Sequence, residues 1–399
     1  MDERTERIGY RVASLRKLAG MTQAKLASTA HVSVSLVRQV ERGKVPASGA
    51  FTAAVARALG LDVTTLTCQP YDDLVSAPRS EAAGIPALRQ VLSEHDNPAP
   101  VVELLSIEEL RARLDAGNRL CVRARYAELA RRLPEVLGSL YAHQAQPPRG
   151  ERANEQLAEL LDDAYALAAA AAHRFGYLDL AAQVDDRRPL TAAATGDPLR
   201  VAGEAFVRTW VPLHRGDYDG CTRLVERAWR AIGDRSDPTA LAVRGQLHLQ
   251  SASIAARAAR GQDADAHLAE ARDIIASGVP SHPYIDIDCS AFNADAHFVA
   301  IPVELLDGAT AVARAQSVHV ADDGEPRRVG AYWVKVARGW VLHGDRAKAL
   351  ESLNKARAVS PQQTRYHHGV REMVRLMAET DRRMTDSLAG FARWVGITI

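Results

Sequence analysis

The sequence predicts an all-α protein with a small N-terminal domain and a much larger helical body. Amphipathic segments with helical spacing follow one another along the 399 residues, and no stretch is rich in strand-forming residues. Aromatic residues make up only 5% of a composition that is 47% hydrophobic. Similar turns also recur between the apolar segments of the C-terminal part, which is typical of helical repeats.

Two short helices joined by a tight turn are predicted near the N-terminus. Thr22 can cap a helix over residues 23–29, because its hydroxyl accepts from the free N–H groups of the first turn. Ser33 can cap a second helix over residues 34–42 in the same way, and Gly43 can end it with a positive φ. The spacing of the two helices is that of a DNA-reading unit.

The motif residues of this segment are Arg16, Thr22-Gln23, Leu26-Ala27, Val32-Ser33 and Glu41-Arg42-Gly43-Lys44. At these positions the chain resembles the XRE-type, lambda-repressor-like helix-turn-helix family over about residues 5–67. The resemblance implies a five-helix lambda-repressor-like DNA-binding domain, which we assign to residues 1–70. His31 stands where the family usually has Gly in the turn, and His tolerates left-handed backbone less well than Gly.

The resemblance also implies which side chains meet DNA. Gln39 would pair with a base edge, Val34 could only touch a thymine methyl group, and Lys44 would meet a phosphate. Gln23 would also bond a phosphate, and DNA shape would add specificity. The expected DNA-binding residues are Gln23, Ser33, Val34, Ser35, Arg38, Gln39 and Lys44. The family's structural ion pair would be formed by Arg16 and Glu41.

Charge is distributed unevenly along the chain. Residues 1–70 contain ten Lys or Arg and five Asp or Glu, whereas the rest of the chain contains 40 basic and 44 acidic residues. A basic N-terminal domain on a mildly acidic body is expected if only that domain meets DNA phosphates.

A proline-rich linker is predicted over residues 71–100, with a short helix over 87–95 inside it. From residue 101 to residue 399 the chain is predicted to form a tetratricopeptide-like helical-hairpin superhelix. Its turns would lie at Gly176, Gly216, Gly261 and Gly344. The clearest repeat unit contains Trp333, Ala337, Trp340, Gly344, Ala349, Leu353, Ala356 and Pro361. Pro212 and Pro302 should kink or end their helices.

Taken together, the two parts resemble actinobacterial XRE-type regulators with tetratricopeptide-like sensor domains and, less closely, the peptide-sensing RRNPP regulators. The resemblance implies a dimeric transcription regulator that senses a small molecule or a peptide on its concave face. The residues expected on that face are Phe206, Trp210, His248, Ser251, Asn293, His297 and Arg338. Asn293 could bond a peptide backbone, but it could equally bond its own helix, and the aromatic residues and His297 could belong to the core.

Other classes of protein are disfavoured. The N-terminus has no apolar signal region, and the most apolar run, residues 164–173, is too short for a bilayer, so a cytoplasmic location is expected. Cys68, Cys121, Cys221 and Cys289 lie far apart without a CxxC pair, which favours reduced and mostly buried thiols.

Catalytic motifs such as GxSxG, GxxxxGK[ST] and HExxH do not occur, so we expect neither an enzyme nor a cofactor. The pairs His368–Glu372 and Asp286–Asp288 could each offer two metal ligands, but two ligands do not make a site. The alternative function that remains is a scaffold or adaptor that uses its repeats to bind a partner protein.

Overall fold

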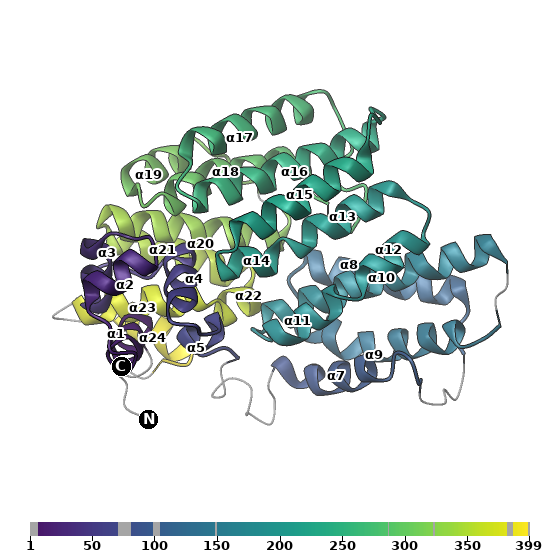
Figure 1. Cartoon of the computed structure of the whole chain (residues 1–399), viewed down its shortest axis with the longest axis horizontal. Helices are drawn as coiled ribbons and strands as arrows, with labels where there is room; N and C mark the ends of the chain where they lie inside the picture. The colour runs from purple at the N-terminus through teal and green to yellow at the C-terminus, as the bar shows by residue number, and fades with distance from the viewer. Residues whose placement is uncertain are drawn as a thin grey trace.

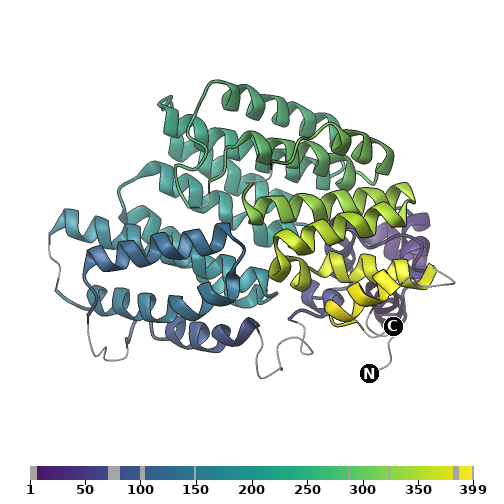
Figure 2. The same ribbon diagram turned by 180° about the vertical axis from the view of Figure 1, so that it is seen from behind.

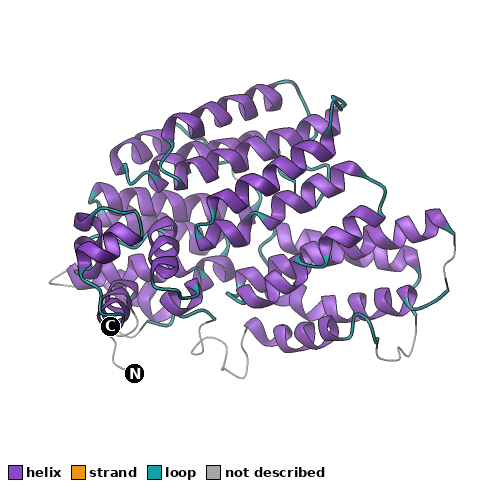
Figure 3. Cartoon of the chain, viewed as in Figure 1, coloured by secondary structure: helices purple, strands orange, loops and turns teal. Residues whose placement is uncertain are grey.

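The computed structural model describes residues 7–70, 81–98, 104–147, 150–285, 287–321, 324–380 and 386–397. Helices and loops account for all of these residues, and no strand occurs among them (Figure 3). The all-α prediction is therefore confirmed. None of the described helices is long and apolar enough to cross a membrane.

The N-terminal domain, called the head below, contains five helices within residues 7–70. They are α1 (Ile8–Leu18), α2 (Gln23–Thr29), α3 (Val34–Glu41), α4 (Gly49–Ala58) and α5 (Val63–Thr67). The first turns of α2 to α5 are capped by short polar side chains, as at Ser48 and Asp62, which accept from backbone N–H groups. A small core that includes Leu26, Val37 and Phe51 lies between the helices. Burial of these side chains supplies most of the stability of so small a domain.

Part of the predicted linker is helical and packs on the body. The 3₁₀ helix η2 (Glu81–Gly84) and helix α7 (Ile85–Ser93) lie against α9 (Tyr126–Gln144), and Leu88 is fully buried there. Pro86 does not interrupt α7, because it occupies the first turn, where its missing N–H would be unpaired anyway. The folded body therefore begins at residue 81, earlier than the expected residue 101. Residues 71–80 lie outside the described residues.

The body, residues 81–397, continues as pairs of antiparallel helices that stack one after another (Figures 1 and 2). Its further helices are α8 (Ile107–Val122), α10 (Glu151–Arg174), α11 (Leu178–Asp185), α12 (Arg188–Ala194), α13 (Pro198–Arg208), α14 (Trp210–Arg215), α15 (Tyr218–Ile232), α16 (Pro238–Arg257), α17 (Gly261–Ala276), α18 (Ala291–Glu304), α19 (Gly308–Gln316), α20 (Pro326–His343), α21 (Arg346–Val359), α22 (Pro361–Tyr366), α23 (His368–Thr380) and α24 (Asp386–Trp394). Each pair buries apolar side chains against its neighbours, so the core runs through the whole stack.

The predicted turn glycines behave in two ways. Gly176, Gly216 and Gly344 have φ values of 83°, 67° and 96°, so they occupy the left-handed region that favours glycine. In the fourth turn the left-handed residue is Ala259 (φ 59°), while Gly261 already belongs to α17. The position of that turn was therefore predicted, but not the residue that makes it.

The prolines near helix ends act largely as predicted. Helix α13 ends at Arg208 and α14 begins at Trp210, so the chain breaks just before Pro212, which cannot donate to the preceding turn. Thr209 at this break is held by Gln250, whose side-chain amide donates to the threonine hydroxyl at 2.6 Å. Pro302 lies close to the end of α18.

The C-terminal helices of the body contact its N-terminal helices. The hydroxyl of Tyr126 donates to Gln363 Oε1 at 3.1 Å, and the N–H of Ala127 donates to Gln362 Oε1 at 3.0 Å. Phe175 and Tyr366 meet edge to face with ring centroids 4.9 Å apart. The stack therefore closes on itself, and the inner faces of its helices surround a central space.

Candidate functional site

The helix-turn-helix segment is fixed by its own caps. The hydroxyl of Thr22 accepts from the N–H of Lys25 at 3.1 Å, and that of Ser33 accepts from the N–H of Leu36 at 3.1 Å. His31 adopts the left-handed conformation predicted for the turn, with φ 54°. The N–H of Val32 then donates to the carbonyl of Ala27, which closes the end of α2.

A buried ion pair ties α3 to α1 and α2. Arg16 donates from Nε and Nη2 to the two carboxylate oxygens of Glu41 at 2.7 and 2.9 Å, and the side chains are only 9% and 6% exposed. The hydrogen bonds that Arg16 donates to Glu41 raise the pKa of Arg16. Gln23 Nε2 also donates to Glu41, at 2.7 Å, an internal contact that the sequence analysis missed. The orientation of α3 is thus set by interactions inside the head.

The outer face of α3 is exposed. Val37 and Val40 face the core, whereas Ser35, Arg38 and Gln39 are exposed on the other side of the helix. Gln39 Nε2 donates to Ser35 Oγ at 3.2 Å, so the amide is aligned along this face. Val34 is half-buried against the core.

Two cations stand beside this face without internal partners. Arg38 and Lys44 are both exposed, and the side chain of neither makes a hydrogen bond or an ion pair with any residue in the described part of the chain. Together with Gln39 they give the face the mixture of an amide and two cations that base edges and phosphates require.

The second candidate site is a cavity of about 540 Å³ inside the closed body. Its wall comes from α10, α14, α16, α18, α20 and α23, among other elements, and from head residues that include the N-terminal ends of α4 and α5. Pro46, Gly49 and Asp62 are among the head residues that contribute. The head therefore covers part of the cavity.

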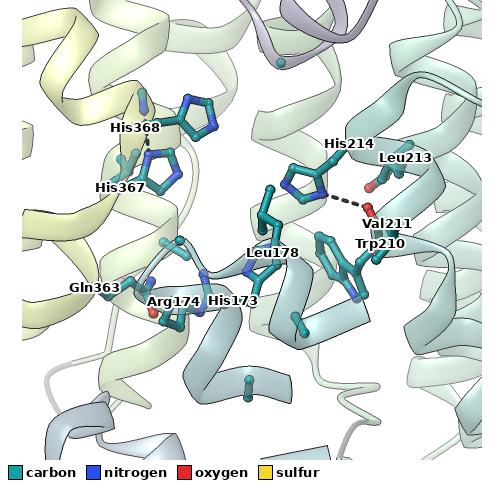
Figure 4. Close-up of a pocket in the computed structure, with 18 of the residues that line it drawn as sticks. His173, Arg174, Leu178, Trp210, Val211, Leu213, His214, Gln363, His367 and His368 are labelled. Carbon is teal, nitrogen blue, oxygen red and sulfur yellow. Dashed lines mark hydrogen bonds between the residues drawn. The ribbon is translucent and has the colours of Figure 1, made fainter. Parts of the chain in front are cut away.

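Four histidines and Trp210 line this cavity, and Figure 4 shows His367 and His368 opposite His214 and Trp210. His173 and His214 meet edge to face with centroids 5.0 Å apart, and His214 Nδ1 lies 2.7 Å from the carbonyl oxygen of Trp210. His367 and His368 stack with centroids 5.2 Å apart. Of these four histidines, only His368 was a candidate from the sequence, because each of them lies near a helix end where no local motif marks it.

Burial keeps these histidines neutral. It lowers the pKa of both His214 and His367 to about 4, and neighbouring positive charges act in the same direction. The pKa values of His173 and His368 lie well below 6.5 for the same reason. At neutral pH the four rings therefore offer hydrogen bonds but no charge.

Five of the seven residues expected on the concave face line the cavity, namely Phe206, Trp210, Asn293, His297 and Arg338. Asn293 is only 2% exposed, and its Nδ2 donates to the carbonyl of Asp288 at 2.7 Å. His297 Nδ1 lies 3.0 Å from Ser253 Oγ. Phe206 belongs to the apolar core behind the wall, and Arg338 donates to Glu304.

The other two residues lie away from the cavity lining. His248 Nδ1 lies 3.1 Å from His267 Nδ1, and its ring meets Trp229 at a centroid distance of 5.0 Å. Ser251 is buried in α16. Both residues were expected on the concave face from the helical periodicity of the sequence. Because α16 is buried on nearly every side, that periodicity does not identify the face that lines the cavity.

Neither metal-ligand pair considered in the sequence develops into a site. Asp286 lies outside the described residues, and Asp288 is held by Arg328 at 2.5 Å. His368 lines the cavity. Among the residues that the structure describes, no group of three or more His, Cys, Asp or Glu side chains is placed to hold a metal ion.

The head is held on the body by the packing of α4 against α14 and by several polar contacts. The Arg57 guanidinium donates to the carbonyl of Gly216, and Asp62 faces Arg215 at 4.0 Å. Gln69 Nε2 donates to the carbonyl of Tyr366 at 3.4 Å. The head lies against α14, at the same end of the molecule as α23 and α24 in both views (Figures 1 and 2).

Comparison with known proteins identifies the head. A family model described as a helix-turn-helix domain matches residues 7–67. No curated protein and no solved structure matches the chain. The match does not extend into the body, whose tetratricopeptide resemblance stays a prediction.

Proposed function

We propose that this chain is a sequence-specific, dimeric transcription regulator whose DNA binding is controlled by a ligand in the cavity. The helix-turn-helix head suggests DNA binding and transcription regulation. The observation that carries the proposal is the exposed face of α3. Its backbone is fixed by caps and by the Arg16–Glu41 pair, while Arg38, Gln39 and Lys44 remain directed to solvent.

Dimerisation is part of the proposal because a single head offers little contact with DNA. One short recognition helix spans only a few base pairs of the major groove. Helix-turn-helix proteins gain affinity and selectivity by placing two such helices on half-sites about one helical turn apart. We therefore expect two copies of this chain on one operator.

Ligand control is proposed from the position of the head. Head residues form part of the cavity wall, and outside it the head contacts the body through packing of α4 on α14 and a few polar contacts. A ligand that binds better when the head is in one position shifts the population toward that position. Helix α3 itself is fixed within the head, so the signal would act on the placement of two heads relative to each other.

Gln39→Ala should weaken binding to the specific DNA site by about 1–3 kcal/mol, because a bidentate amide–base contact is lost. Affinity for random DNA should hardly change, since no charge is removed. Fluorescence anisotropy with both duplexes measures the two affinities, and the exposed Gln90→Ala in α7 is the matched control. Equal losses on both duplexes would remove Gln39 from the base-reading residues.

Lys44→Ala should weaken binding to every DNA sequence and make the salt dependence shallower by about one unit of the log–log slope. The physical reason is the release of about one fewer counterion when one phosphate contact is lost. Titrations over a salt series measure the slope, with the exposed Lys355→Ala as control. An unchanged slope would place Lys44 away from the phosphates.

The proposed function is tested by titrating the purified chain with duplexes from the region upstream of its own gene. Shuffled duplexes of the same length and composition are the comparison. A regulator should prefer one upstream duplex at physiological salt, and two chains should bind each molecule of this preferred duplex. The same affinity for all duplexes, or only one chain per site, would contradict the proposal.

A further inference from the structure

The charged side chains in the cavity wall are mostly cations. Among the described residues in its wall, seven are Arg or Lys and four are Asp or Glu. Two of the four acids, Asp62 and Asp179, are exposed at the surface. The inner wall therefore has a clear excess of positive charge, and the nearby histidines are neutral.

Internal acids pair with Arg328 and Arg327, but they compensate Arg257 and Arg338 only in part. Glu304 alone faces two guanidinium groups, Arg257 at 3.8 Å and Arg338 at 3.3 Å. Arg257 Nη1 and Arg338 Nη2 are buried, yet neither makes a hydrogen bond with any residue that the structure describes. Free N–H groups that are buried in this way cost free energy unless an acceptor is supplied.

Lys335 is the least compensated of the cations. It lies on α20 in the cavity wall, and its ammonium group makes no hydrogen bond or ion pair with any described residue. Burial, together with the positive charge of Arg328, lowers the pKa of Lys335 to about 8. The ammonium group is still mostly protonated at pH 7, so a cation without a partner faces the cavity.

Aromatic and apolar side chains form another part of the wall. Trp210 is 37% exposed beside the histidines, and Phe206, Val334 and Met373 also line the cavity. A volume of about 540 Å³ lies in the range of small-molecule sites, which is roughly 300–1,000 Å³. The lining thus offers cations on one side and an aromatic, apolar surface on another.

We propose that the cavity binds a small organic anion, with its carboxylate or phosphate group at Lys335, Arg257 and Arg338 and its apolar part against Trp210. The inference rests on the proposed function, since it names the class of ligand for the same cavity. A small molecule fits better than an extended peptide, because the Asn293 amide N–H is already donated to the chain's own backbone.

The same arginine group connects the anion site to the head. A Cβ added at Gly49, the first residue of α4, would lie 3.6 Å from the Arg257 guanidinium. An anion that draws Arg257 toward it therefore acts directly beneath the head. A movement of Arg257 on ligand binding would therefore act directly on α4 and so on the position of the DNA-binding helices.

Two fluorescent probes of nearly the same shape test the anion site. 8-Anilinonaphthalene-1-sulfonate carries a negative charge, and N-phenyl-1-naphthylamine is its uncharged counterpart. Lys335→Met should reduce the affinity for the sulfonate about tenfold and leave the affinity for the neutral probe nearly unchanged, because one charge-assisted contact is lost. Lys355→Met, the same substitution on the outer face of α21, should change neither.

A second measurement uses the unaltered protein, so it does not depend on the variant's folding. Phenylacetate or phenyl phosphate should displace the sulfonate probe, and benzyl alcohol should not. The concentrations at which phenylacetate and phenyl phosphate displace the probe are then compared. The anion that is effective at the lower concentration shows whether the site prefers a carboxylate or a phosphate. Displacement by benzyl alcohol at the same concentrations, or equal loss of both probes in Lys335→Met, would overturn the anion site.

The effect on DNA is measured separately. If the anions bind in the cavity but leave DNA affinity unchanged, ligand control in the proposed function fails while the anion site stands. If DNA binding is selective but no anion binds, the anion site fails and the regulator remains.

Discussion

Replacing Glu41 with alanine is expected to destabilise the head by about 3–5 kcal/mol, because a buried guanidinium loses its carboxylate. Arg16 and Gln23 both donate to this carboxylate, so α1, α2 and α3 lose a shared partner at once. Small domains have a total stability of only about 5–15 kcal/mol, and DNA binding should be lost with the fold. Urea unfolding followed by circular dichroism, together with DNA anisotropy, measures both effects.

An exposed ion pair provides the control for this prediction. Glu351 pairs with Lys355 at 2.8 Å on α21, but its side chain is 62% exposed. Glu351→Ala should therefore change the free energy of unfolding by less than about 1 kcal/mol. The double variant Arg16→Met/Glu41→Leu should recover much of the lost stability, since it leaves no unpaired charge. A loss in Glu41→Ala as small as in Glu351→Ala would contradict the structural role of the pair.

Mild acid is expected to destabilise the body steeply. His214 and His367 have folded-state pKa values of about 4, and those of His173 and His368 also lie well below 6.5. Below pH 6.5 the unfolded chain binds protons that the folded chain does not, so stability falls as the pH falls. Each such histidine contributes at most about 1.4 kcal/mol per pH unit. The effect acts between pH 6.5 and about 4.

Urea unfolding at pH 7, 6 and 5 measures this dependence. His173→Gln removes one titrating ring from the cavity, so the slope of stability against pH should become shallower. His319→Gln, at an exposed position, is the matched control and should leave the slope unchanged. A free energy of unfolding that stays constant from pH 7 to pH 5 would show that the cavity histidines are not buried as described.

The head could be predicted closely because its structure is fixed by local signals. Thr22 and Ser33 cap their helices within three residues of the groups they bind, and Gly43 ends α3 within the same segment. The Arg16–Glu41 pair was expected only through the family resemblance. The contact of Gln23 with Glu41 could not be foreseen, since a glutamine in this position is equally able to bond a phosphate.

The helical class of the body was predictable, but its closure was not. Tyr126 and Gln363 are separated by 237 positions, and no local pattern links them. The sequence pattern indicated Gly261 as the residue of one turn, whereas the left-handed residue there is Ala259. A left-handed alanine depends on packing around the turn, which a local sequence pattern does not contain.

The cavity could be predicted only in part, because its residues come from many helices. Trp210 and Asn293, which were expected on the concave face, line the cavity. Arg257 and Lys335 resemble the solvated charges of any amphipathic helix until closure of the body brings them together. His248 was misplaced because α16 is surrounded on almost every side.

Selection of DNA by sequence at the outer face of α3 is tested most directly by mixing the full chain with fragmented DNA of the source organism at physiological salt and sequencing the bound fragments. The bound fragments should share one motif, present as two half-sites, and Gln39→Ala should remove the enrichment while retaining residual binding. Bound fragments without a common motif, or the same motif enriched by Gln39→Ala, would contradict selection by α3.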